Sequence, residues 1–257
     1  MYMSDDRKKY LRQIHKEKII ITVFRIFILL FFLIGWEVLA RIDFINTFTF
    51  SSPCKIFETL FKLLKDGDLF KHIGISLYEI IISFFASGFL GFIIAIILWW
   101  FPIVSKILDP YLTIINSLPK VALGPLIIIW VGASINSIIF MSLLISLFIT
   151  IINIYNSFLN TDTKYIILMK SFGANKWQIF KNTILPSNYK NIINSFKINI
   201  SMNLIGVIMG ELLVSKGGIG YLIMYGSQVF NINLVISGVF ILGIISYLMY
   251  FVIDKFE

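Results

Sequence analysis

Stretches of about 20 apolar residues recur along the chain, and they constrain its fold more than any other feature. A segment of that length with few charges can cross the hydrocarbon core of a bilayer as a helix. We predict six spans, at residues 19–39, 75–101, 112–131, 135–155, 196–213 and 232–253. Since 58% of the 257 residues are hydrophobic and only 14% are charged, a water-soluble core cannot hide so much apolar surface. We expect an all-α membrane protein with one domain over residues 1–257.

Basic residues are unevenly divided between the two sides of these spans. Lysine and arginine concentrate on the cytoplasmic side of membrane proteins. If the N-terminus is cytoplasmic, the cytoplasmic segments hold 15 of them and the outer segments hold 6. The outer six are Arg41, Lys55, Lys62, Lys65, Lys71 and Lys216. We therefore expect both termini in the cytoplasm.

The net charge of +8 does not require a nucleic-acid partner, because lysines and arginines that set membrane topology account for it. The single cysteine, Cys54, excludes an intrachain disulfide. The two histidines, His15 and His72, fall in predicted loops, and the chain has no HExxH or CxxC spacing. We expect no metal site and no cofactor in this chain.

An amphipathic pattern occupies residues 53–65, between the first two spans. Ile56, Leu60, Leu63 and Leu64 share one face of the predicted helix. Such a helix lies on the membrane surface or caps the helix bundle. Contact with a transported solute is the less favoured alternative.

The longest predicted cytoplasmic segment, residues 156–195, is polar and rich in lysine. Its pattern predicts two short helices separated at Gly173, with Thr161 or Asp162 as the first cap. The second piece, residues 174–183, is amphipathic. A hairpin of this kind docks into a groove of a partner protein or lies on anionic lipid, and the residues alone leave both open.

Within that segment, the run KSFGANKWQIFKNTILP resembles the signature loop of bacterial ATP-binding-cassette (ABC) importer permeases. In that loop a leucine and a proline stand twelve and thirteen residues after a glycine. Gly173, Leu185 and Pro186 keep this spacing. The family's Glu-Ala-Ala, which precedes the glycine, is replaced at residues 167–169. Its isoleucine, two positions before the leucine, is replaced by Thr183.

Two further runs are similar to the nitrate/sulfonate/taurine branch of this family. They are DPYLTIINSLPKVALGPLIIIWVG, at the third span, and GELLVSKGGIGYLI, at the end of the fifth. The resemblance covers residues 50–253. It implies the type I ABC-importer permease fold and a multi-pass transport subunit of the bacterial cytoplasmic membrane, not an enzyme.

The resemblance also implies partners. Two permease copies would pair in the lipid bilayer, an extracytoplasmic solute-binding protein would deliver the solute, and a cytoplasmic ATPase dimer would bind ATP and Mg²⁺. The chain has no GxxxxGK[ST] phosphate-binding loop of its own. The implied ATPase-coupling residues are Lys170, Gly173, Ala174, Trp177, Phe180, Leu185 and Pro186. The implied solute is an anion such as a sulfonate, nitrate or taurine, or alternatively a vitamin precursor such as a pyrimidine or riboflavin.

Small residues repeat at helical spacing within two spans. Ser83, Ser87, Gly91 and Ala95 form one stripe, and Gly206 and Gly210 form a GxxxG pair. Small side chains let helix backbones approach closely in lipid, so we predict close packing there, within one chain or between two copies.

Polar residues within the spans are candidates for a translocation route. Charges at depth are costly, which singles out Lys120, whereas Glu79 and Glu211 fall near predicted span edges. The candidate set is Asn116, Lys120, Ser146, Thr150, Asn199 and Asn203. Hydrogen bonding between helices explains these residues equally well.

Three other classes of membrane protein are less favoured. An ion-coupled carrier would show an inverted repeat, and we detect none. An intramembrane enzyme would carry a catalytic constellation within its spans, and no histidine lies in one. A non-catalytic membrane scaffold would not account for the spacing from Gly173 to Leu185-Pro186.

Overall fold

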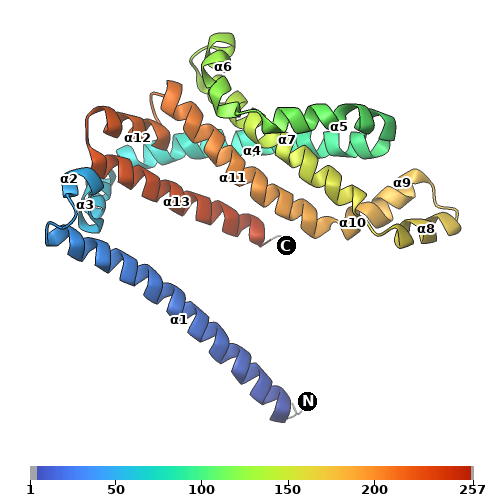
Figure 1. Cartoon of the computed structure of the whole chain (residues 1–257), viewed down its shortest axis with the longest axis horizontal. Helices are drawn as coiled ribbons and strands as arrows, with labels where there is room; N and C mark the ends of the chain where they lie inside the picture. Colours follow the sequence, from blue (N-terminus) through green and yellow to red (C-terminus); the bar gives the residue numbers. More distant parts are fainter. Residues whose placement is uncertain (1–4, 256–257) are drawn as a thin grey trace.

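The computed structural model describes residues 5–255, which form helices and turns with no strand among them (Figure 1). The longer helices are α1 (Asp5–Arg41), α3 (Pro53–Lys65), α4 (Asp68–Trp100), α5 (Pro102–Ser117), α7 (Ile135–Leu159), α11 (Tyr189–Val214) and α13 (Ile232–Asp254). The shorter elements are α2 (Thr47–Phe50), a 3-10 turn (Lys120–Leu123), α6 (Gly124–Val131), α8 (Thr163–Ser171), α9 (Lys176–Ile179), a π-helical turn (Phe180–Ile184), α10 (Leu185–Ser187) and α12 (Ile219–Gln228).

The helices confirm the predicted all-α membrane architecture. Within the described residues, five helices are long and apolar enough to cross a membrane, and α5 with α6 makes a sixth if the bent pair is one span. Several helices extend beyond the predicted spans, because hydropathy marks only the part that matches hydrocarbon. α1 contains His15 and α4 contains His72, so the prediction that both histidines lie in loops is wrong. α11 begins at Tyr189, inside the predicted loop 156–195.

The third predicted span, residues 112–131, is not one straight helix. α5 already begins at Pro102, and it meets the 3-10 turn and α6 at an angle of 81°. The break falls at Leu118, whose backbone is extended, directly before Pro119. Proline disfavours the helical conformation of the preceding residue, which explains the break. Pro125 lies in the first turn of α6, where proline is tolerated.

The core of the bundle is formed by α4, α7 and α11, which pack on one another along much of their length. Gly206 and Gly210 of α11 lie against the backbone of Ser142 and Ile138 of α7. On α4, a Cβ atom at Gly91 would be only 2.9 Å from Cγ2 of Thr150. The predicted small-residue faces are therefore close-packed within one chain.

α1 stands apart from this core (Figure 1). Most of its apolar side chains from Ile19 to Val38 are exposed. It is attached at its C-terminal end, where Glu37 accepts hydrogen bonds from Arg41 at 2.8 Å and from the backbone N–H of Cys54 at 3.0 Å. α1 therefore presents exposed apolar side chains to lipid or to another protein.

α3 has the amphipathic character predicted for residues 53–65. Ser52 caps its N-terminus by accepting a hydrogen bond from the N–H of Lys55, and Pro53 occupies the first turn. The helix packs against α13 and α4, and Ile56 is buried. It therefore caps one end of the bundle, together with α2 and α12 (Figure 1).

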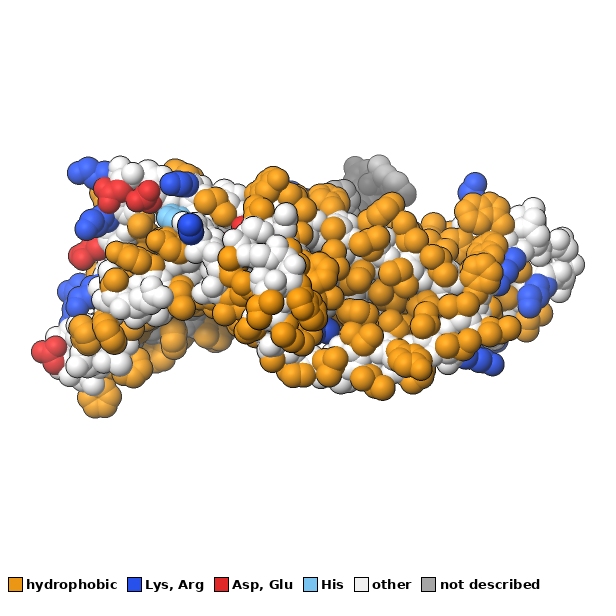
Figure 2. Space-filling model, turned by 90° about the horizontal axis from the view of Figure 1, so that it is seen from above, with side chains coloured by type: hydrophobic (Ala, Val, Ile, Leu, Met, Phe, Trp, Pro, Cys, Tyr) orange, Lys and Arg blue, Asp and Glu red, His pale blue; other side chains and the backbone are white. Residues whose placement is uncertain are grey.

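Figure 2 shows hydrophobic side chains over the middle of one face of the molecule. Most of the lysine and arginine side chains visible on this face gather near its two ends. This distribution is expected of a protein whose middle lies in hydrocarbon and whose ends meet water.

We predict that Gly206→Ala destabilises the bundle by about 1–3 kcal/mol, because the added methyl group has no space beside the backbone of Ser142. Gly243→Ala on α13 is the matched control, since no atom lies within 4 Å of a Cβ built there. The control should be neutral or slightly stabilising, because alanine favours helix over glycine. Unfolding of the purified chain in detergent measures both. Equal stability of the two variants would contradict the close packing of α7 and α11.

Candidate functional site

The segment that carries the signature motif folds as a two-part hairpin, α8 followed by α9. Asp162 caps α8 by accepting a hydrogen bond from the N–H of Lys164 at 2.9 Å, which confirms one of the two predicted caps. α8 ends at Ser171, and Gly173, two residues later, has a φ of +76°. No atom lies within 4 Å of a Cβ built on Gly173, so the left-handed backbone requires glycine here and packing does not.

The second part of the hairpin begins with a capping box. The side chain of Asn175 accepts from the N–H of Gln178 at 2.9 Å, and the side chain of Gln178 accepts from the N–H of Asn175 at 2.8 Å. A π-helical turn then leads to Leu185-Pro186. Proline removes a backbone hydrogen bond from a helix, and a wider turn directly before it accommodates the change in path. The chain therefore continues through Pro186 as a distorted helix, beyond the predicted amphipathic piece at residues 174–183.

An aromatic cluster fixes the hairpin to the end of α4; its members are Trp99, Trp100, Phe158, Trp177 and Phe180. The ring of Phe180 lies 5.1 Å from that of Trp99 and 5.7 Å from that of Phe158, between ring centres. Nζ of Lys176 lies 5.4 Å and 5.2 Å from the ring centres of Trp99 and Trp100, and it donates to the carbonyl of Trp100. These contacts join the hairpin to α4 and α7 by large, interlocking side chains.

Asn188 closes the base of the hairpin. It is 3% exposed, and its amide donates to the hydroxyl of Thr161 at 2.6 Å and to the carbonyl of Ile184 at 2.8 Å. The residue thereby ties the start of the hairpin to the start of α11. We did not predict this role. From the sequence, an asparagine after Leu-Pro is typical of a turn, and its partner Thr161 lies 27 positions away.

The outer face of the hairpin is apolar and exposed. Phe172 is 78% exposed, Ile167 is 62% exposed and Trp177 is 57% exposed. Of the predicted coupling residues, Lys170, Gly173, Trp177 and Pro186 are exposed, Ala174 and Leu185 are half-buried, and Phe180 is buried. Exposed aromatic side chains on a rigid support are typical of a protein-docking surface.

Four of the six predicted pathway residues meet in one buried network, the polar cluster; its members are Ser87, Ser142, Ser146, Thr150, Asn199 and Asn203. Each is 0% exposed. The amide of Asn199 donates to Thr150 at 2.6 Å, and the amide of Asn203 donates to Ser87 at 3.0 Å. The hydroxyls of Ser142 and Ser146 donate to Oδ1 of Asn203 at 2.8 Å and 3.2 Å. The cluster hydrogen-bonds α4, α7 and α11 together, as interhelical polar residues do in lipid.

Lys120 and Asn116 lie apart from the polar cluster, at the bend between α5 and α6. Both are half-buried. Nζ of Lys120 donates to the carbonyl of Asn116 at 3.2 Å and to its side-chain oxygen at 3.0 Å, and it lies 5.9 Å from the ring centre of Phe148. The ammonium group therefore has few polar partners besides one asparagine. A role for this pair in translocation stays a prediction.

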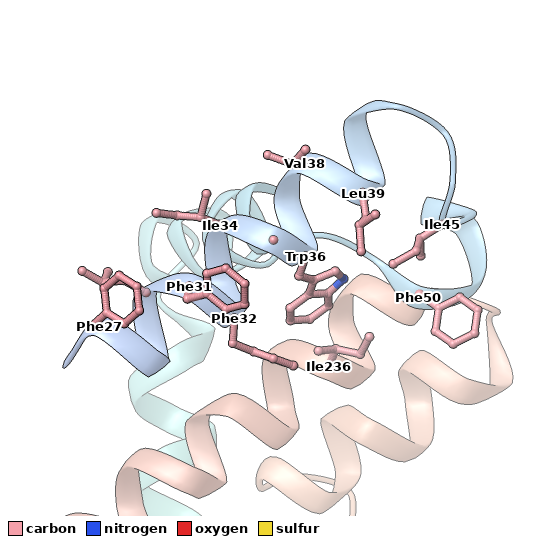
Figure 3. A pocket seen from close by; sticks show the side chains of 12 residues that line it. Phe27, Phe31, Phe32, Ile34, Trp36, Val38, Leu39, Ile45, Phe50 and Ile236 are labelled. Atoms are coloured by element: carbon pink, nitrogen blue, oxygen red, sulfur yellow. The ribbon is translucent and has the colours of Figure 1, made fainter. Parts of the chain in front are cut away.

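A cavity of about 1040 Å³ lies beside α1, but its chemistry does not suit a polar solute. Figure 3 shows its lining, which includes Phe31, Trp36 and Phe50 with Ile236 of α13. Such an apolar groove fits lipid tails or an apolar helix. Within residues 5–255 no group of three or more His, Cys, Asp and Glu side chains could hold a metal ion.

A bundle of apolar spans with a polar interior and an exposed helical hairpin defines a polytopic membrane transport protein. Comparison with known proteins gives the family. The model of the binding-protein-dependent transport system inner membrane component family matches residues 87–257, and the chain belongs to this family. It is a multi-pass transport subunit of the inner membrane.

Individual relatives agree with this family. The permease protein SsuC of Bacillus subtilis, named for aliphatic sulfonates transport, is 28% identical over 82% of this chain and 76% of its own length. The formylaminopyrimidine transport permease protein ThiX of Halalkalibacterium halodurans is 28% identical over 89% and 92%. The structure also resembles an inward-facing MetNI methionine ABC transporter chain, with a TM-score of 0.62, 20% identity and coverage of 72% and 94%. This confirms the ABC-permease fold.

We predict that Asn188→Ala loosens the hairpin, because it leaves the buried hydroxyl of Thr161 without its donor at a cost of about 1–3 kcal/mol. Amide hydrogen exchange across residues 160–175 should accelerate roughly 5- to 160-fold. Asn182→Ala, at an exposed asparagine of the same segment, is the control and should exchange as the natural chain does. Unchanged exchange in Asn188→Ala would show that the aromatic cluster alone holds the hairpin.

Proposed function

We propose that this chain is the membrane-spanning permease of an ABC importer, in which the α8–α9 hairpin docks on a separate ATPase. ATP and Mg²⁺ would be bound by an ATPase dimer in the cytoplasm, and a solute-binding protein would deliver the solute from outside. Two copies of the chain would pair, each as one permease domain over residues 1–257. The exposed apolar face of an otherwise well-anchored hairpin is the observation that carries this proposal.

The docking surface combines apolar and basic side chains. Phe172 and Tyr165 are exposed on it. Lys164, Lys170 and Lys181 are exposed on the same hairpin segment. Aromatic anchors with a charged rim favour a protein groove of complementary shape and negative charge. Pushing on this surface would move the ends of α4 and α7, because the aromatic cluster connects them to the hairpin.

The orientation of the chain follows from the same assignment. The hairpin end would face the cytoplasm, and the end formed by α2, α3 and α12 would face outward. The six basic residues expected outside, among them Lys55, Lys71 and Lys216, belong to segments at that second end. Fewer positive charges on the outer side agree with the distribution that sets topology.

For the solute, we propose a small anion such as a sulfonate, taurine or nitrate. Similarity to a permease named for aliphatic sulfonates supports this. Similarity to a formylaminopyrimidine permease supports a vitamin precursor as the second candidate. Uptake of labelled taurine, an alkanesulfonate and a formylaminopyrimidine by cells that express the chain with its neighbouring transport genes separates the two. Uptake of the pyrimidine alone would reject the anion.

We predict that Phe172→Asp weakens copurification of the ATPase at least about tenfold, because a charge replaces an apolar anchor. Phe172 is 78% exposed, so the change should leave the fold intact. Phe44→Asp is the matched control, since Phe44 is also 78% exposed and lies near the opposite end, after α1. The control should bind the ATPase normally. If Phe172→Asp instead retains the ATPase but loses binding to anionic vesicles, the hairpin is a lipid-contacting element and the docking proposal is wrong.

We predict that Lys120→Ala slows uptake of an anionic solute several-fold, because it removes the positive charge at the bend between α5 and α6. Lys120→Arg keeps the charge and should retain most of the uptake. Initial uptake rates in membrane vesicles, corrected for the amount of permease, measure both. A Lys120→Ala variant that transports at the normal rate removes Lys120 from the translocation route.

A further inference from the structure

Two glutamates from different helices are buried against each other where α4, α11 and α12 meet. Glu79 of α4 is 2% exposed and Glu211 of α11 is 1% exposed. Ser76, three residues before Glu79 on α4, donates to the carboxylate of Glu211, so both carboxyl groups lie in the same buried contact between α4 and α11. None of the salt bridges within residues 5–255 includes either carboxyl group. Both glutamates lie near the edges of the predicted spans, but tertiary packing closes over their carboxyl groups.

Glu211 is surrounded by donors. The hydroxyl of Ser76 donates to its Oε1 at 2.5 Å, and the N–H of Gly220 donates to its Oε2 at 2.5 Å. The backbone N–H of Tyr221 also donates to it. The last two N–H groups belong to the first turn of α12, whose dipole favours a negative charge. These donors would stabilise a negative charge on Glu211.

The turn before α12 is shaped around this carboxylate. A Cβ on Gly218 or Gly220 would collide with the side chain of Glu211, and Gly218 also has a φ of +99°. From the sequence, GGIG has the simple explanation of a turn. The structure adds that its glycines make space for a buried charge.

Glu79 has the opposite surroundings. Its Oε2 is buried with no hydrogen-bond partner among the described residues, and so is the hydroxyl oxygen of Ser83, one helical turn away. An ionised carboxylate in this position would carry an uncompensated charge beside that of Glu211, at a large cost. A protonated Glu79 carries no charge and can donate its proton to Glu211.

Other titratable groups near the pair do not neutralise it. His72 of α4 accepts from the N–H of Gly218 at its Nδ1, at 3.0 Å, and stacks on Tyr221 of α12 at 5.8 Å between ring centres. Nearby, α7 and α13 present isoleucines such as Ile138 and Ile241. Lys62 of α3, Lys71 of α4 and Lys216 in the turn before α12 are exposed at the surface.

We propose that Glu79 and Glu211 share one proton, held on Glu79, and that this proton locks the α4–α11–α12 corner together. Loss of the proton places two negative charges in contact in a site that water does not reach, so the corner separates. The lock is therefore a pH-sensitive device that weakens under alkaline conditions. On the orientation proposed above, the corner lies on the outer side, where the pH varies with the environment.

The sign of the pH effect follows from proton counting. A glutamate in water is ionised above about pH 5, whereas the folded chain keeps the proton on Glu79. The folded state then binds one more proton than the unfolded state, so stability falls as the pH rises. One such proton lowers the folding equilibrium constant about tenfold per pH unit, until the folded chain also releases it.

Infrared spectroscopy of the full chain in lipid nanodiscs detects the proton directly. The natural chain should show the C=O band of a buried, protonated carboxylic acid at neutral pH. Glu79→Gln should remove this band, and Glu58→Gln, at an exposed glutamate of α3, should retain it. Absence of the band from the natural chain would overturn the proposal, and this result does not depend on whether any variant folds.

Unfolding of the same samples between about pH 5 and pH 9 tests the lock. Glutamine keeps a donor toward Glu211 and cannot ionise. The folding equilibrium constant of Glu79→Gln should therefore lack the tenfold change per pH unit that one proton contributes. Glu58→Gln should keep the slope of the natural chain. The same slope in all three chains would contradict the proposal. Stabilisation by Na⁺ over K⁺ without the infrared band would also contradict it, because a cation would then take the place of the proton.

The consequence for transport rests on the proposed function. In a reconstituted transporter, uptake should decline at alkaline outer pH, and Glu79→Gln should flatten that decline. If no ATP-driven uptake is found, the proposed function fails, while the infrared and unfolding results still decide on the shared proton.

Discussion

The close packing of α4, α7 and α11 is the constraint on which the rest of this structure depends. In lipid, apolar side chains gain little by leaving one hydrocarbon environment for another, so helices associate through short backbone distances and hydrogen bonds. Gly206 and Gly210 supply the short distance, and the polar cluster around Asn199 and Asn203 supplies the bonds. Four of the six residues that suggest a solute path in sequence thus hydrogen-bond the helices to one another.

Each end of this core supports a different element. At one end the aromatic cluster joins α4 and α7 to a hairpin with exposed apolar side chains, which suits transmission of force from another protein. At the other end Ser76 of α4 and the first turn of α12 both donate to Glu211, and the proposed proton on Glu79 acts at the same corner. Both devices act on α4, so a displacement of its hairpin end and the lock at its far end are mechanically connected. This is how an importer would link an event at one membrane face to a gate at the other.

Much of this protein could be predicted because membranes impose strong rules on sequence. Length and hydropathy located the spans, the spacing from Gly173 to Leu185-Pro186 located the hairpin, and the separation of Gly206 from Gly210 located a packing face. The misses have physical causes. Hydropathy does not register that Leu118 must leave the helix before Pro119, and it assigns polar helix ends such as those of α4 and α11 to loops.

By itself, the sequence determined the class of solvent, the number of spans, the family and the position of the hairpin, because each depends on composition or on spacing along the chain. Only the tertiary structure decided that Asn188 bonds Thr161, that four of the six pathway candidates join one buried network, and that Glu79 and Glu211 are buried at the same corner. Those outcomes depend on which helix faces come together, and residues 132 positions apart carry no local signal of their contact. Burial then determines whether a carboxyl group ends in water or against a second carboxyl.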